Sequence, residues 1–503
     1  MANRAPWRRT LLAVFLLIGF YALALTILGA LVFLPYAEWV YLHRADLAIT
    51  IPCILGALGI AAGILPRFDR FQPPGPVLLP DRHPELYRVI QQTAAAARQP
   101  LPRHVYLIPG VNAWVAERGG IMGFGSERVM GLGLPLMQAL TVSEFRGVLA
   151  HEFGHFYGGD TVLGPWLYKT RAAIGRTLGN LSRRALIRLP FEWYAKTFLR
   201  ITHAVSREQE YSADALAARI AGIAPVVSGL KTIHALAPAF EPFWMTEMGP
   251  ALEAGIRPPM LEGFHHFITA PAVARRIQEQ LAKQLTTSES DPYDTHPPLK
   301  DRLAALPADP VVPDPEPALP ALSLLNEPGQ LEESLLTAIL PKAMAARLVA
   351  ASWTELGSRV WLPRWTEAVR TLSARLGGLR AEELGSYAET PAELAVRLGI
   401  AARTDVASER HITEARYLAG AALVLALTAR GFTLSALPGE EVTLTRDDLA
   451  IMPFALLDDL KSGKLSQSEW RERCVRAGLH GLDLGTVLPP ASSGTAKEPP
   501  TLA

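Results

Sequence analysis

The stretch VLAHEFGHFYGG, residues 148–159, brings together residue types that can do metal chemistry. His151 and His155 are four residues apart, and residues i and i+4 share one face of a helix, so both imidazoles can point at one ion. Glu152 directly follows the first histidine and can reach water bound to that ion as a general base. The alternative is three polar residues on an ordinary helix surface. Because only 12 of 503 residues are histidine, we favour the metal site.

A catalytic zinc site needs a third protein ligand and one open position. Downstream carboxylates and imidazoles supply seven candidates: His203, Glu208, Glu210, Asp214, His234, His265 and His266. In SREQEYSADALAARIAG, residues 206–222, Glu210 and Asp214 stand four apart on one face of an expected helix. That spacing suits a ligand followed by an acid that orients a histidine, and it also suits a solvated acidic face. Spacing alone leaves Glu208 open.

The residues around the two histidines predict the elements that position them. Thr141, followed three residues later by Glu144, is the pattern of a capping box at a helix N-terminus. Apolar residues then recur at helical spacing, and a glycine pair supplies a stop. Upstream, we expect a helix at 85–98 and short, glycine-broken strands within 104–110 and 112–133.

Two apolar runs near the N-terminus indicate a membrane anchor. Residues 11–35 carry no charge and exceed the roughly 20 residues that a transmembrane helix needs, and residues 47–65 are just long enough. A cleaved signal peptide is the alternative for the first run, but its apolar region is usually about 7–15 residues. More arginines lie just before the first run and just after the second run than in the loop between the two runs. Both termini are therefore expected on the cytoplasmic side.

Residues 160–200 combine eight cationic side chains with two acidic ones, and large apolar residues are interleaved among them. No charge-free run in this segment is long enough to span a bilayer. It is either a cationic amphipathic surface against the cytoplasmic leaflet or a basic helical pair packed on the protein. The sequence favours neither.

Composition limits the classes of function. The formal net charge is +1, so no global basic bias points to nucleic acid. Apolar residues make up 49% of the chain and the mean hydropathy is +0.17, which fits membrane segments. Cys53 and Cys474 are the only cysteines, and Cys53 lies in an apolar run. Neither a disulfide framework nor a cysteine-based metal site is expected.

The chain is too long for one domain, and a Pro-rich segment is its clearest linker. We expect five parts: a membrane anchor at 1–70, a catalytic domain at 71–305, the linker at 306–320, a mostly helical accessory region at 321–487 and a disordered tail at 488–503. In the accessory region, a charge-free core of 13 residues between Arg416 and Arg430 predicts a buried helix, and residues 431–448 predict a small hairpin.

Three motifs in order give the chain a family resemblance. HEFGH at 151–155, SREQEYSAD at 206–214 and DTHPPLKDRLAAL at 294–306 resemble the membrane zinc metallopeptidases of family 48, which include HtpX-type bacterial proteases and CAAX prenyl proteases. NAWVAERGGI at 112–121 is similar to the Asn-Ala strand that precedes the active-site helix in that family. The resemblance implies an α+β, mainly α, fold with a zincin-like (gluzincin) catalytic domain built on a small sheet and the HExxH helix.

The resemblance also implies roles for single residues. One zinc ion per chain would be held by His151, His155 and Glu210, with Glu152 as the general base. Asp214 matches the acid that orients a histidine ligand. His296 and Arg302 match a His-Pro…Arg element, and Asn112 and Ala113 match the substrate strand. The His-Pro…Arg element orients substrate, stabilises the oxyanion or forms an Arg–carboxylate lock, and in some relatives its histidine approaches the metal.

Two departures limit the resemblance. HtpX-type proteases usually carry two further membrane segments between the two ligand helices, where this chain has the cationic residues 160–200, so a four-span topology is not carried over. The roughly 200 residues after the linker match no part of the family pattern and lack a tetratricopeptide signature.

Together these observations predict a multi-pass zinc endopeptidase anchored in a bacterial inner (cytoplasmic) membrane by two spans, with its catalytic domain on the cytoplasmic side. Its partners would be membrane lipid and unfolded or membrane proteins, which it would hydrolyse in quality control, and not nucleic acid. One alternative is a noncatalytic, zinc-containing peptide-binding scaffold, which would have no use for Glu152. Another is a CAAX-type prenyl-peptide protease, which needs more spans than the two apolar runs provide.

Overall fold

The computed structural model describes residues 6–44, 46–65, 70–120, 125–156, 164–182, 184–287, 296–307 and 318–488. The chain forms two compact units that do not follow chain order. The first contains Met1–Pro238 and Ile277–Leu340, and the second contains Ala239–Arg276 and Pro341–Ala503. Most of the predicted linker and nearly all of the predicted tail lie outside the described residues.

A four-stranded sheet in the first unit confirms the predicted strands. Its strands are β1 (Val77–Leu78), β2 (His104–Ile108), β3 (Ala113–Arg118) and β4 (Glu127–Gly133). The order is β1-β2-β4-β3, so β3 is an edge strand. β2 and β4 run parallel, whereas β3 pairs with β4 in antiparallel register, with Ala113 opposite Leu132.

Helix α5 (Val142–Gly154) begins with the predicted capping box, in which Thr141 and Glu144 bond to each other's backbone. It follows the short helix α4 (Leu134–Ala139), and the predicted upstream helix is α3 (Pro84–Ala96). α5 packs closely on the long helix α7 (Arg188–Ala221), because a Cβ on Gly154 would come within 2.8 Å of the Ala213 backbone.

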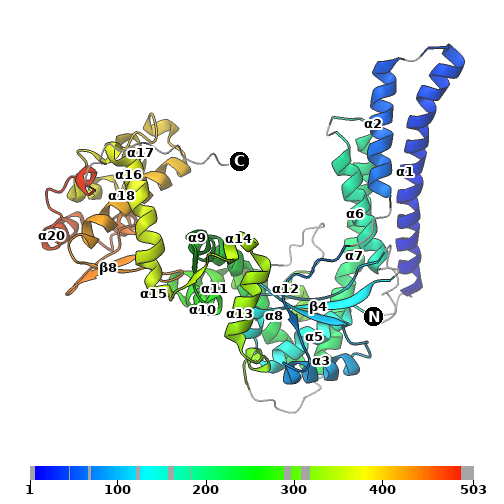
Figure 1. Ribbon diagram of the computed structural model, residues 1–503, viewed down its shortest axis with the longest axis horizontal. Coiled ribbons are helices and arrows are strands. Elements are labelled where there is room, and N and C mark those ends of the chain that lie inside the picture. Colours follow the sequence, from blue (N-terminus) through cyan, green and yellow to red (C-terminus); the bar gives the residue numbers. More distant parts are fainter. Residues whose placement is uncertain are drawn as a thin grey trace. The chain divides into compact units, whose positions relative to one another are not determined.

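Two long apolar helices form the N-terminal hairpin, α1 (Pro6–Leu42) and α2 (Leu47–Ile64). The cationic segment forms α6 (Gly164–Asn180) and the first half of α7, and both run alongside α1 and α2 (Figure 1). A buried apolar cluster joins the four helices, including Phe20 of α1, Ile60 of α2, Ile174 of α6 and Phe198 of α7. The basic helical pair is therefore packed on the N-terminal hairpin.

Three helical segments are long and apolar enough to cross a membrane: Val14–Leu42, Leu47–Ile64 and Ile223–Glu253. The third was not expected from the sequence. It begins with α8 (Ile223–Phe243) and continues through η2 (Trp244–Met248) and α9 (Gly249–Glu253). Helix α11 (Pro271–Thr286) is divided between the two units at Arg276. The remaining elements of the first unit are α12 (Leu299–Ala304), η3 (Ala321–Leu324) and α13 (Pro328–Ile339).

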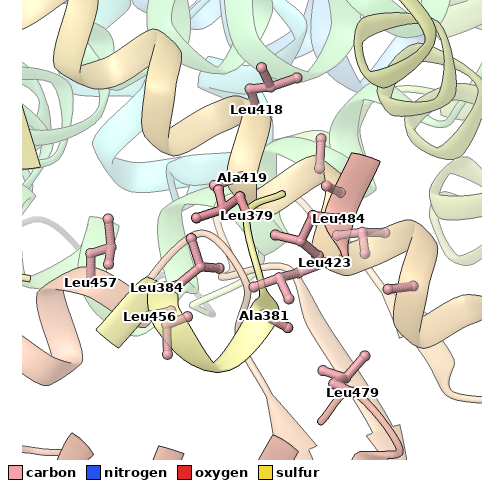
Figure 2. Packing of buried hydrophobic residues seen from close by; sticks show 14 of the residues in the cluster. Leu379, Ala381, Leu384, Leu418, Ala419, Leu423, Leu456, Leu457, Leu479 and Leu484 are labelled. Atoms are coloured by element: carbon pink, nitrogen blue, oxygen red, sulfur yellow. The ribbon is translucent and has the colours of Figure 1, made fainter. Parts of the chain in front are cut away.

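The second unit surrounds the helix α18 (Glu409–Thr428), which is buried as predicted. Figure 2 shows part of its apolar cluster, with side chains from η5 (Ala381–Tyr387), α18 and α19 (Leu456–Lys461). The predicted hairpin is β7 (Thr433–Ser435) with β8 (Thr443–Arg446), extended by β9 (Leu449–Ile451). Other elements are β5 (Ile256–Arg257), α10 (Met260–Thr269), α14 (Lys342–Ala345), β6 (Val349–Ala350), α15 (Trp353–Leu356), η4 (Gly357–Trp361), α16 (Leu362–Leu376), α17 (Pro391–Arg397), η6 (Thr404–Val406), α20 (Gln467–Ala477) and η7 (Leu484–Thr486).

Candidate metal centre

The packing of α5 on α7 brings three potential metal ligands together. His151 lies in the last turn of α5, His155 caps that helix, and Glu210 projects from α7. The Nε2 atoms of His151 and His155 lie 3.5 and 3.6 Å from the two carboxylate oxygens of Glu210. All three donors lie within 4.8 Å of one another. Ligands of a tetrahedral zinc ion, each bound at about 2.0–2.1 Å, are roughly 3.3 Å apart, so the observed spacing fits such an ion.

The charges of this site also fit a cation. Burial alone would raise the pKa of Glu210, but hydrogen bonds with His151 and His296 and the charge of Arg302 hold it well below its ordinary value. Glu210 is only 4% exposed, and its buried Oε2 makes no hydrogen bond of ordinary geometry in the described part of the chain. This oxygen lies 3.5 Å from Nε2 of His151 and 3.5 Å from Nη2 of Arg302, while Nε2 of His155 lies near the other oxygen. A bound metal ion would give this buried carboxylate the close partner that it lacks.

The two imidazoles have different surroundings. Burial lowers the pKa of His155 to about 4, and the nearby His151 adds to that effect, so His155 keeps its lone pair. Burial would also lower the pKa of His151, but hydrogen bonds with Asp214 and Glu210 raise it to about 9. The carboxylates of Asp214 and Glu210 therefore stabilise positive charge at the imidazole of His151.

Asp214 orients His151 from behind. One of its oxygens lies 2.9 Å from Nδ1 of His151, which leaves Nε2 directed at Glu210. The same carboxylate accepts two hydrogen bonds from Arg302, from Nε at 2.8 Å and from Nη2 at 2.7 Å. Arg302 is 5% exposed, so the contacts are those of a buried Arg–carboxylate lock, one of the alternatives that the sequence left open.

His296 lies on the opposite side of Glu210. Its Nδ1 is 3.1 Å from Oε1 of Glu210, and its side chain is 60% exposed. It borders the same cavity as His151 and Glu152. An exposed imidazole at this place can meet a bound molecule, whereas Arg302, which also borders the cavity, is only 5% exposed.

Glu152 follows His151 on α5 and reaches the edge of the sheet at Val115. Burial raises the pKa of Glu152 to about 7, and its carboxylate accepts a hydrogen bond from the backbone N–H of Val115. Gly133 N donates to Asn112 O at 2.8 Å, so alternate residues from Asn112 onwards turn their backbone groups toward β4. The backbone groups of Ala113 and Val115 therefore face the free edge.

A cavity of about 360 Å³ opens beside these groups. One wall is formed by α5 and the start of β3, and the other by apolar residues of α8. Its lining residues are Asn112, Ala113, Glu144, Gly147, Val148, His151, Glu152, Asp214, Val226, Gly229, Leu230, Ile233, His234, Ala237, Pro238, Gln284, His296 and Arg302. The cavity thus joins a polar end at the metal donors to an apolar end on α8.

Residues 80–309 match the family model described as Peptidase family M48. This part of the chain is an M48 peptidase domain. The names of curated relatives agree with this match to a peptidase family. The chain is 27% identical to a protease HtpX homolog of Acaryochloris marina, over 40% of this chain and 73% of the relative. It is 24% identical to one of Arthrobacter sp., over 45% and 72% of the two chains. A homolog of Nostoc punctiforme is 28% identical over 32% and 62%. No solved structure matches significantly.

Among the described residues, the other candidate ligands are not part of the group formed by His151, His155 and Glu210. Glu208 is exposed on α7, two residues before Glu210. His234 lines the cavity and its Nδ1 lies 2.9 Å from Oε1 of Gln284. His265 and His266 lie on α10 in the second compact unit, and the side chain of His203 lies outside the described residues.

Three features of the domain were not found from the sequence. These are the hydrogen bond from Val115 to Glu152, the pairing of His234 with Gln284, and the apolar wall formed by α8. The first is a backbone contact and leaves no trace in residue type. His234 did stand among the candidate ligands, so its chemistry was visible although its place was not.

Proposed function

We propose that this chain is a membrane-anchored zinc endopeptidase with a zincin-like (gluzincin) active site. The observation that carries the proposal is the meeting of His151, His155 and Glu210 within 4.8 Å, beside a cavity that also contains Glu152. Membership of residues 80–309 in a peptidase family agrees with it.

His151, His155 and Glu210 would hold one zinc ion per chain, and Asp214 would fix the orientation of His151. When bound, zinc lowers the pKa of a coordinated water toward about 7 and polarises the scissile carbonyl. A purely structural zinc site is normally closed by four protein ligands, whereas this donor set has three and faces a cavity.

Glu152 would act as the general base. It would take the proton from the attacking water and pass that proton to the nitrogen of the leaving amine. The N–H of Val115 would keep its carboxylate in place. His296, exposed at the rim, would contact the substrate carbonyl or its oxyanion. Arg302 would hold Asp214 by two hydrogen bonds and support the negative charge of Glu210, whose Oε2 lies 3.5 Å from its Nη2.

The substrate would bind in an extended conformation along β3. The free backbone groups of Ala113 offer strand addition, and the apolar wall on α8 would receive a side chain. Strand addition requires an unfolded or flexible substrate segment, so unfolded and membrane proteins are the proposed substrates in protein quality control.

The anchor would consist of α1 and α2, with the peptidase domain on the cytoplasmic side of a bacterial inner membrane. We do not assign the third apolar segment to the membrane. Its first part, α8, lines the cavity with residues such as Leu230 and His234, and Gly229 approaches Glu144 of α5. One face of α8 is therefore part of the cavity wall of the peptidase domain.

The test is metal content and casein cleavage of the detergent-purified full chain. Wild type should contain one zinc per chain and cleave casein, and a chelator should remove both. Glu210→Ala should weaken zinc binding and abolish cleavage, whereas Glu208→Ala, its exposed neighbour, should change neither. Zinc binding without cleavage of any unfolded protein would favour the peptide-binding scaffold. Cleavage confined to prenylated C-terminal peptides would favour the CAAX-type protease.

A further inference from the structure

The turn between α6 and α7 lies against the middle of α2. Asn180 at the end of α6 donates its side-chain amide to Gly59 O at 3.1 Å, and Arg176 donates Nε to Gly63 O at 3.2 Å. A Cβ on Gly56 would come within 2.9 Å of the Ile187 side chain. Small residues on α2 therefore let this turn pack directly on an apolar helix.

The depth of the turn follows from helix geometry. Gly56 precedes Ile64, the last residue of α2, by eight residues, which is about 12 Å along the helix. The hydrocarbon core of a bilayer is about 30 Å thick, and α2 has 18 residues with which to cross it. If α2 spans the membrane, Gly56 lies close to the bilayer centre, so the turn reaches through the cytoplasmic leaflet to about that depth.

The outer face of this turn is apolar as well. Leu186 is 80% exposed, Leu189 58% and Trp193 69%, whereas Phe191 on the opposite side is buried in the four-helix cluster. The turn therefore shows large apolar side chains both to the hairpin and to its surroundings. A contiguous exposed group of this kind, ending in a tryptophan, is typical of a membrane interface.

Exposed cationic side chains accompany this apolar face. Arg184 lies in the turn, and Lys196 and Arg200 follow Trp193 along α7. Arg188 is engaged within the protein, where it donates to Leu178 O, Leu181 O and Glu192. Long cationic side chains next to an immersed segment extend to the headgroup level, where anionic lipids attract them.

We propose that the α6–α7 turn is inserted into the cytoplasmic leaflet, and that Lys196 and Arg200, further along α7, bind the headgroups of anionic phospholipids. The inference rests on the α1–α2 membrane anchor of the proposed function. It also has a consequence for the active site. Helix α7 continues without a break from Trp193 to Glu210, which is 17 residues or about 25 Å along its axis. Insertion of the turn would therefore fix the distance of the metal centre from the membrane.

Spin labels in lipid nanodiscs test the insertion. Single cysteines would replace Leu186, Leu55 on the exposed face of α2 and Val475 on the surface of the second unit, in a chain with Cys53→Ala and Cys474→Ala. Collision with oxygen reports lipid, and collision with a water-soluble nickel chelate reports water. The proposal expects Leu186→Cys to behave like Leu55→Cys and unlike Val475→Cys.

Water exposure of the label at Leu186, with lipid exposure at Leu55, would overturn the inserted turn and leave the anchor intact. Water exposure at both positions would remove the anchor and the inserted turn together. Neither readout depends on proteolysis, so failure here is distinct from failure of the zinc-peptidase proposal.

A second measurement tests the headgroups. A fluorophore at Leu189→Cys would be quenched by brominated phosphatidylglycerol or brominated phosphatidylcholine at equal mole fraction. The proposal expects about twofold stronger quenching by the anionic lipid, and Lys196→Gln and Arg200→Gln together should abolish this preference. A matched double change at exposed Lys342 and Lys461 in the second unit should not. Equal quenching by the two lipids in wild type would contradict the binding of anionic headgroups.

Discussion

Asp214 and Arg302 form a bidentate ion pair, with hydrogen bonds of 2.8 and 2.7 Å, although they are 88 residues apart in the sequence. Both side chains are buried, and the same aspartate lies 2.9 Å from Nδ1 of His151. One carboxylate thus connects α12, α5 and α7 behind the candidate metal centre. We therefore expect Arg302 to contribute to this centre mainly by holding Asp214 in place.

The first prediction concerns metal affinity. Asp214→Asn keeps the shape of the side chain but removes the charge that fixes the tautomer of His151. Loss of such a partner typically costs about 10–100-fold in metal affinity, and we expect that loss here. Competition with a zinc chelator would measure it. The control is Asp448→Asn, which disrupts an exposed bidentate pair with Arg476 and should leave zinc affinity unchanged.

The second prediction concerns stability. Arg302→Met leaves Asp214 as a buried carboxylate without its cationic partner, and breaking a buried pair in this way typically costs about 3–5 kcal/mol. Chemical denaturation, followed by hydrogen exchange of α7 in the metal-free protein, would measure the change. Arg476→Met breaks the exposed pair and should cost less than about 1 kcal/mol. Equal effects of the two variants would contradict the lock.

The third prediction concerns the substrate strand. Each residue of a good substrate would be N-methylated in turn, which removes one backbone donor without altering the enzyme. A strand added to the free edge at Ala113 uses the backbone groups of every second residue on that side. We expect a period of two, with losses of about 5–10-fold in kcat/KM at sensitive positions, as one lost hydrogen bond implies. A uniform effect along the peptide would rule out strand addition.

The fourth prediction concerns pH and a residue away from the metal. His83 is buried, and its Nδ1 accepts a hydrogen bond from the backbone N–H of Asn326 at 3.2 Å. Burial and the charge of Arg82 lower the pKa of His83 below its ordinary value of 6.5. Between the folded pKa and 6.5, the His83 side chain therefore binds a proton in the unfolded chain but not in the folded chain. The stability present above pH 6.5 is lost as the pH falls toward the folded pKa.

We expect Tm to fall more between about pH 7 and about pH 5 in wild type than in His83→Gln, whose amide oxygen can accept the same hydrogen bond without titrating. His265→Gln, at an exposed position, is the control and should follow wild type. A His83→Gln variant with the full pH dependence of wild type would show that another group is responsible.

The parts of the fold that the sequence predicted depend on local interactions. The capping box of Thr141 and Glu144 sets the start of α5, and i,i+4 spacing places His151 and His155 together. The charge-free core of α18 was recognisable as a buried helix because it is too short to span a bilayer.

The parts that could not be predicted depend on tertiary contacts. The packing of the cationic helices on α1 and α2 uses Gly56, Gly59 and Gly63, which look like ordinary small residues of an apolar helix. The length of the apolar segment at Ile223–Glu253 was not recognised, because Lys231 and Glu241 interrupt it. The choice among the roles of Arg302 required knowing that Asp214 lies beside it.

The change Glu152→Gln in zinc-loaded protein tests most directly whether the chain is a zinc endopeptidase with Glu152 as its general base. This change keeps the size of the side chain and the metal donors His151, His155 and Glu210, but it removes the base. We expect one zinc per chain, as in wild type, with casein cleavage reduced by about 10²–10⁴-fold. Cleavage by zinc-loaded Glu152→Gln at the wild-type rate would contradict the assignment.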